Sequence, residues 1–287
     1  MAHNLKSPKS KKILSAIIIN FLALILLLWI IFPVYWMIVS SFKTWEDLFR
    51  PDLFVLNPTI ESYVTVFTQS YFRVHLFWRQ MGNSILVSSG TVAIVLFVSI
   101  FGGYALGRMY FKGKRYIGTV TLLTYLLPST FLAIPYYKVM TSYGLYNTPW
   151  ALMLAMGALY SPYGMWILSD FFRGIPREIE EAALVDGASK LKIFYKMFLP
   201  LSGPALAAVS TFAFLMAWND YLFALLLLSS ESNLTMPLVM GGFLVSDEAP
   251  WNLFMAVGFI YSIPPVIFYY SFKKYLVTGI FRGAVKS

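Results

Sequence analysis

Residues 174–204 read GIPREIEEAALVDGASKLKIFYKMFLPLSGP, a charged and helix-forming stretch in a chain that is otherwise apolar. Pro176 suits the first position of a helix, where its missing N–H costs nothing, and the glutamates after it suit the positive end of the helix dipole. Gly187 is the expected left-handed stop of this helix, Ser189 can cap a second short helix, and Pro200 marks the turn into the next apolar run. The three-and-four spacing gives the first helix one face of mostly small residues: Ile179, Ala182, Ala183 and Asp186.

The segments on both sides of this stretch are apolar enough to lie in lipid. Of the 287 residues, 59% are hydrophobic and 12% are charged, against about 25% charged in an ordinary soluble domain. A helix needs about 20 apolar residues to cross a bilayer. Six runs reach this length, one of them with Asp220 as its single acid: 13–42, 80–107, 116–137, 139–169, 201–230 and 249–272. The sequence therefore predicts an all-α polytopic membrane protein with six transmembrane helices.

The basic residues predict the orientation of these helices. If both termini are cytoplasmic, 17 of the 22 lysines and arginines lie inside, and the outer segments hold only five: Lys43, Arg50, Arg73, Arg79 and Lys138. The positive-inside rule favours this arrangement. It gives a cytoplasmic tail (1–12), a first transmembrane helix with an outer segment (13–79), a core of five helices (80–274) that contains the cytoplasmic loop 173–200, and a second cytoplasmic tail (275–287).

Several kinds of chemistry lack the residues that they need. The chain has no cysteine, and its two histidines, His3 and His75, lie far apart in the sequence, so neither a metal site nor a catalytic site is predicted. The basic residues cluster at the ends of apolar runs instead of forming a stripe, which argues against nucleic acid as a partner. No phosphate-binding G-x-x-x-x-G-K-[ST] loop is present. Any ATP hydrolysis must therefore take place on another polypeptide.

The stretch that begins at residue 174 resembles the EAA loop of binding-protein-dependent ABC importer permeases. The resemblance rests on Glu181-Ala182-Ala183, Asp186-Gly187-Ala188 and Leu199-Pro200, placed between the fourth and fifth of six predicted spans. Further stretches are similar to the MalG-like subunits of carbohydrate importers: Pro33–Trp36, Ser40–Lys43, Asn83-Ser84, Trp218–Tyr221, Lys274–Gly279 and Gly283–Lys286. Members of that family more often carry Glu where Asp220 stands.

The resemblance implies a type I ABC importer permease fold in the cell inner membrane. It implies three kinds of partner besides membrane lipid: a homologous MalF-like permease, two ATPase subunits that bind ATP and Mg, and an extracytoplasmic sugar-binding protein. No cofactor is expected in this chain. The resemblance also implies a coupling helix that docks into a cleft of the ATPase, with these residues as the coupling set: Glu181, Ala182, Ala183, Asp186, Gly187 and Pro200. The alternative is an ordinary amphipathic helix on the membrane surface, although such helices usually bury Trp, Phe or Leu.

Two further sets of residues are candidates for function. Asp220 is the single acid within a predicted span, which makes it a candidate for the sugar pathway together with Trp218 and Asn219. A solvated acid at the outer mouth, or one hydrogen-bonded to a neighbouring helix, is an equally open reading. For four residues of the outer loop 230–250, the resemblance implies contacts with the binding protein: Asn233, Thr235, Met240 and Gly241. The alternative is that this loop is a plain connector. The pair of glycines after Met240 is expected to make that loop flexible.

Three other functions were weighed against a sugar importer. The same architecture could import a polyol or glycerol phosphate. A self-sufficient secondary transporter would show inverted repeats with interrupted helices at matching positions, which the sequence does not reveal. A membrane enzyme would need convergent acids or histidines near the interface, and the predicted spans hold too few of these groups.

Overall fold

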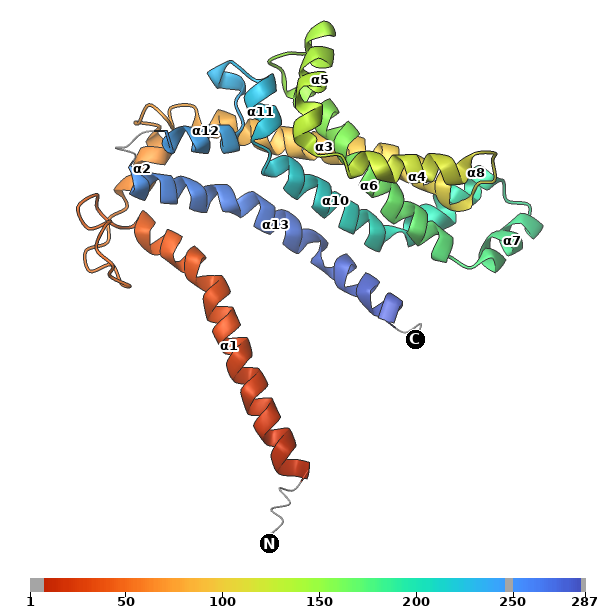
Figure 1. Ribbon diagram of the computed structural model, residues 1–287, viewed down its shortest axis with the longest axis horizontal. Helices are drawn as coiled ribbons and strands as arrows, with labels where there is room; N and C mark the ends of the chain where they lie inside the picture. Colours follow the sequence, from red (N-terminus) through yellow and green to blue (C-terminus); the bar gives the residue numbers. More distant parts are fainter. Residues whose placement is uncertain (1–7, 246–249, 285–287) are drawn as a thin grey trace. The chain divides into compact units, whose positions relative to one another are not determined.

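The computed structural model describes residues 8–245 and 250–284, and within these ranges all regular structure is helical. The all-α prediction is confirmed (Figure 1). The chain forms two compact units, one of Met1–His75 with Ser246–Ile260 and the other of Leu76–Val245 with Tyr261–Ser287. The helices run in this order: α1 (Pro8–Ser41), α2 (Glu61–Thr68), α3 (Phe77–Arg108), α4 (Lys114–Tyr125), α5 (Ser129–Ser142), α6 (Pro149–Gly174), α7 (Arg177–Val185), α8 (Lys190–Ile193), the π-helix η1 (Phe194–Phe198), α9 (Leu199–Leu201), α10 (Gly203–Trp218), α11 (Leu222–Leu227), the 3-10 helix η2 (Glu231–Asn233), α12 (Met236–Phe243) and α13 (Trp251–Ala284).

Several of the described helices could cross a membrane by their length and composition. Four of them are long and apolar enough to cross a bilayer as single helices, namely α1, α3, α6 and α13. Two bent pairs raise the possible number of spans to six. One pair is α4 with α5, bent by 98°, and the other joins Lys190–Leu201 to α10 with a bend of 69°.

Breaks between helices correct three of the predicted spans. The run 116–137 is broken after Tyr125, because Pro128 lacks an N–H and disfavours helical geometry in the residue before it. The run 139–169 is two elements, since the chain turns through left-handed residues at Gly144 and Asn147 before α6 begins at Pro149. The run 201–230 is divided into α10 and α11. Hydropathy gives the length of an apolar stretch but does not report bends within it.

The larger unit is built on close contact between α3 and α6. An added Cβ at Gly103 would lie 2.7 Å from the Cβ of Leu168 and 3.1 Å from the backbone nitrogen of Ser169. One at Gly107 would lie 2.9 Å from the carbonyl oxygen of Ser169 and 3.0 Å from the Cβ of Phe172. Helices in membranes associate through such small residues, and a four-residue spacing of glycines is a common form of this contact. Gly103 and Gly107 therefore fix how α6 lies on α3.

The smaller unit has a buried lysine in the segment that follows α1. Lys43 is 2% exposed, and its Nζ donates hydrogen bonds to the carbonyl oxygens of Arg50 (2.8 Å) and Asp52 (3.1 Å). The same ammonium lies 4.9 Å from the ring centroid of Trp36. A buried cation is tolerated only when its donors are satisfied, so Lys43 closes the loop 44–52 back onto the end of α1.

The contact between α3 and α6 generates a stability prediction. Gly103→Ala should destabilise the protein by about 1–3 kcal/mol, because overpacking forces the two backbones apart. Gly82→Ala is the matched control on the same helix, since no heavy atom lies within 4 Å of its added Cβ. The control should gain up to about 1 kcal/mol from helix propensity. Thermal unfolding of the two purified variants in one detergent checks this, and an equal or higher unfolding temperature for Gly103→Ala would contradict the packing argument.

Candidate coupling site

The short helix α7 is defined by local signals at both ends. It begins at Arg177, one residue later than predicted, because Pro176 takes an extended conformation and stands as the N-cap. At the other end Gly187 has a φ of +78°, which confirms the predicted left-handed stop. The Ser189 hydroxyl then accepts a hydrogen bond from the Lys192 N–H at 3.3 Å, so the predicted cap of α8 is also confirmed.

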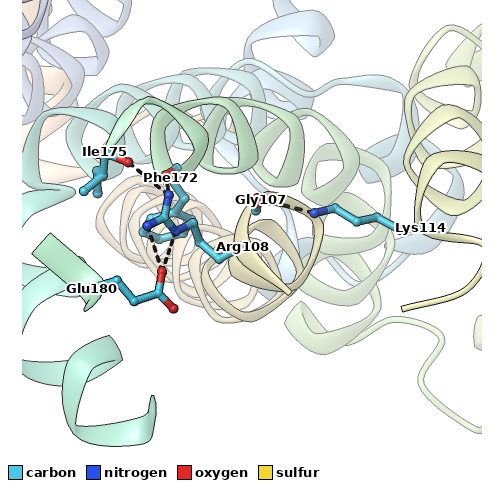
Figure 2. A network of polar contacts seen from close by, with 6 residues as sticks. All are labelled: Gly107, Arg108, Lys114, Phe172, Ile175 and Glu180. Atoms are coloured by element: carbon cyan, nitrogen blue, oxygen red, sulfur yellow. Dashed lines mark hydrogen bonds and ion pairs between the residues drawn. The ribbon is translucent and has the colours of Figure 1, made fainter. Parts of the chain in front are cut away.

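Arg108, at the end of α3, attaches α7 to the rest of the larger unit (Figure 2). Its Nη2 and Nε donate to the same carboxylate oxygen of Glu180, at 2.8 and 3.1 Å. Its Nη1 donates to the carbonyl oxygen of Ile175 at 3.0 Å and more weakly to that of Phe172 at 3.5 Å. The Arg108 side chain is 6% exposed and that of Glu180 is 23% exposed. One buried guanidinium thus holds an acid of α7 and the last carbonyl groups of α6, where a positive charge also suits the helix dipole.

An aromatic cluster lies beneath this guanidinium. The Arg108 side chain lies 4.8 Å from the ring centroid of Phe198, a contact that the ring quadrupole makes favourable. The ring of Tyr104 packs against Phe194 at 4.7 Å and Phe198 at 5.5 Å. Both phenylalanines belong to the π-helix η1, and residues four apart lie on one side of such a helix. The same buried core includes Ala183 of α7.

The predicted coupling residues divide into exposed and buried ones. Glu181, Ala182, Asp186 and Gly187 are exposed, and so is Pro200 in α9. Ala183 is only 9% exposed and packs with the chain's own core, so its small side chain lets α7 approach that core. No heavy atom lies within 4 Å of a Cβ added to Gly187, which means that its backbone angle, not crowding within this chain, requires glycine. The part that these residues play toward an ATPase stays a prediction.

The candidates for the sugar pathway lie at the break between α10 and α11. The carboxylate of Asp220 accepts a hydrogen bond from the Phe223 N–H at 3.0 Å, so this acid caps the start of α11. Trp218 is buried and stacks against Tyr261, with ring centroids 4.8 Å apart, while Asn219 is exposed. The structure therefore brings Asn219 and Asp220 to a helix break and places the Trp218 ring in the core. Their role in a sugar pathway stays a prediction.

The candidates for a binding-protein contact belong to an ordered segment, contrary to the flexible loop that was expected. Residues 236–243 form α12, and a Cβ added to Gly241 would lie 2.5 Å from the ring of Tyr221. Gly241 is thus needed for close packing and not for flexibility. The Asn233 amide donates to the carbonyl oxygen of Asn147 at 2.7 Å, and Thr235 is buried. Met240 is half-buried, and a role for all four residues toward a binding protein stays a prediction.

Sequence reasoning missed two residues that organise this unit. Arg108 was counted only as one basic residue among 17, although it directly follows the pair Gly103 and Gly107. Asn147 has a left-handed backbone, and its Oδ1 accepts hydrogen bonds from the N–H groups of Ser229 (3.0 Å) and Ser230 (2.9 Å). An asparagine between Tyr146 and Thr148 at the start of α6 could have been recognised as a turn residue, but its partners lie more than 80 residues away.

Comparison with known proteins settles the family. Residues 99–282 match the protein family described as "binding-protein-dependent transport system inner membrane component". The chain belongs to this family. The permease is 33% identical to the trehalose/maltose transport system permease protein MalG of Thermococcus litoralis, over 96% of this chain and 99% of that protein. It is 34% identical to the inner membrane ABC transporter permease protein YcjP of Escherichia coli K12, over 89% and 91% of the two chains.

A solved structure has the same fold. The permease superimposes on a chain of a bacterial ABC transporter involved in the import of the acidic polysaccharide alginate, with a TM-score of 0.77. The match covers 96% of this chain and 99% of the other at 22% identity. The predicted importer permease fold is therefore confirmed.

The geometry around Arg108 generates a prediction for α7 of the permease. Arg108→Gln removes the charge that holds Glu180 and the end of α6, so the amide hydrogens of α7 should exchange about tenfold faster or more. Arg108→Lys should not restore protection, because one ammonium cannot reproduce the planar array of donors. Arg177→Gln is the matched control, since this arginine of α7 is exposed and lies over the ring of Tyr110. Hydrogen–deuterium exchange of peptides covering 175–189 provides the measurement, and unchanged exchange in Arg108→Gln would refute the anchoring role.

Proposed function

We propose that this permease is the MalG-like subunit of an ATP-driven importer for a sugar or an oligosaccharide. It pairs with a MalF-like permease, two ATPase subunits that bind ATP and Mg, and an extracytoplasmic binding protein. ATP is hydrolysed on the ATPases, and the permease itself makes and breaks no covalent bond. Closure of the ATPases moves α7 and switches the pathway between its inward-open and outward-open states.

The observation that carries the proposal is the combination of anchoring and exposure in α7. One side of the helix is fixed by the Glu180–Arg108 ion pair and by buried Ala183. The other side presents Glu181, Ala182 and Asp186 to solvent. A helix that transmits force needs a firm attachment to its own core and a small, directional surface for its partner. Leu184 and Val185 of α7 are exposed as well, so the surface that the helix offers to a partner is partly apolar.

Carbohydrate as the substrate class is supported by the relatives. Proteins similar to the permease over most of their length include the MalG of a trehalose/maltose system and the diacetylchitobiose uptake permease DasC of Streptomyces coelicolor. The latter is 30% identical over 93% of this chain and 96% of that protein. These names support a sugar more than a polyol or glycerol phosphate.

The proposed orientation places α7 and both termini in the cytoplasm. Single cysteines at Ser189 and at Glu231, both exposed positions, should react with a membrane-impermeant thiol reagent from opposite sides. The native chain contains no cysteine, so it gives no background. Labelling of intact cells should detect the cysteine at 231 only, and permeabilised cells should show both. Labelling of both positions in intact cells would overturn the orientation.

Two substitutions test coupling separately from folding. Glu181→Lys reverses the charge on the exposed side of α7, and Gly187→Leu places a branched side chain at a φ of +78°. Both variants should reach the membrane at normal levels, because neither residue lies in a predicted span. Sugar uptake and substrate-stimulated ATP hydrolysis should fall together by about tenfold or more, since the docking contact and the helix stop are lost.

These assays use the whole complex, isolated by mild solubilisation. Analysis of the isolated complex identifies the companion chains and the bound sugar. Glu178→Lys is the matched control, because this exposed acid lies earlier on α7 and outside the proposed docking set. The permease purified alone should hydrolyse no ATP. Normal uptake with firmly bound ATPase in both Glu181→Lys and Gly187→Leu would contradict the proposal.

A further inference from the structure

A cavity of about 490 Å³ lies in the larger unit beside the start of α4 and the last turns of α6. Its volume falls in the range of small-molecule sites, about 300–1,000 Å³. Neither the coupling helix nor the break at Asp220 contributes to it. It is therefore a separate feature of the permease, outside the function proposed above.

The charge of this cavity is strongly unbalanced. Lys114, Arg115 and Arg173 line it, and none of its described lining residues is acidic. Glu180, the acid nearest in this network, is already held by Arg108 (Figure 2). Arg173 donates through Nη2 to the Ser169 hydroxyl at 2.9 Å, and the Lys114 Nζ donates to the Met109 carbonyl oxygen at 2.9 Å. Both contacts are with neutral groups, and within the described residues no acid forms an ion pair with any of the three basic side chains.

The rest of the lining is apolar and leads onto an exposed apolar surface. Leu106, Leu122, Pro162 and Trp166 form the walls opposite the basic groups. On the outer side of α4 the exposed apolar side chains continue at three-residue intervals: Ile117, Val120 and Leu123. A free anion such as inorganic phosphate would make no use of these walls. A ligand with an anionic head and hydrocarbon chains would use both parts.

We infer that this cavity binds the headgroup of an anionic phospholipid, with its acyl chains along the outer side of α4. Arg115 and Arg173 hold the phosphate, and the Ser169 hydroxyl, which accepts a hydrogen bond from Arg173, donates its own hydrogen to it. Basic pockets between transmembrane helices are known to select anionic lipids over zwitterionic ones. The site takes its ligand from the leaflet that faces α7.

The test uses the assembled transporter in nanodiscs made from phosphatidylcholine and phosphatidylglycerol. Native mass spectrometry should show phosphatidylglycerol retained in preference to phosphatidylcholine. The double variant Arg115→Gln/Arg173→Gln should lose that preference by about tenfold or more, because each basic group near a membrane surface contributes several-fold to anionic lipid binding. Arg115→Lys/Arg173→Lys should keep most of it. Lys192→Gln/Lys196→Gln is the matched control: these exposed lysines lie outside the cavity, so removing them should lower the preference far less than removing the two arginines.

Several outcomes would overturn the inference. Equal retention of both lipids by the unaltered protein, or unchanged retention in the double glutamine variant, would show that the cavity does not select an anionic lipid. Displacement of phosphatidylglycerol by millimolar glycerol phosphate would show a site for a free anion. Loss of ATPase subunits from the double glutamine variant with lipid retention intact would show a protein contact. Both arginines are exposed, so an unchanged unfolding temperature should exclude misfolding as the cause of lipid loss.

Discussion

The position of α7 depends on a single buried guanidinium. Arg108 ends α3, holds the carboxylate of Glu180 in α7, binds the last carbonyl groups of α6 and lies on the ring of Phe198. A buried ion pair adds little net stability, but loss of one partner leaves an uncompensated charge in a poorly solvated place. The contact therefore serves to hold α7 in place more than to stabilise the fold. It links α3, α6 and α7, so a movement of α7 would be transmitted to α3 and α6.

That link works only because the helix that carries it is itself fixed. Gly103 and Gly107 let the backbone of α3 approach α6 closely, and Arg108 follows directly. An arginine on a loosely packed helix could not reach the carbonyl groups of α6 and the acid of α7 together. The close packing of α3 on α6 and the ion pair thus act together. The glycines set the distance between α3 and α6, and the guanidinium connects both helices to α7.

Features set by neighbouring residues could be predicted from the sequence, and features set by distant partners could not. The stop at Gly187 and the cap at Ser189 depend on local chemistry, and both were confirmed. The partner of Arg108 lies 72 residues further along the chain, so nothing in its own neighbourhood identified it. The breaks between α4 and α5 and at Asp220 were missed because hydropathy cannot distinguish a straight apolar run from a broken one. The glycines of α12 were misjudged for a related reason, since the ring that packs on Gly241 comes from Tyr221.

The π-helix η1 has a consequence for how the length of this region can vary. An α-helix turns about 100° per residue, so an insertion or deletion of one residue between Gly187 and Gly203 that η1 did not absorb would rotate all that follows. Phe198 would leave the guanidinium, and α10 would present a different side to α3. Substitutions in this stretch change single contacts, whereas an insertion or deletion changes the register of the whole core. In a chimaera that exchanges this loop with that of another permease, the number of residues between Gly187 and Gly203 therefore matters more than which residues they are.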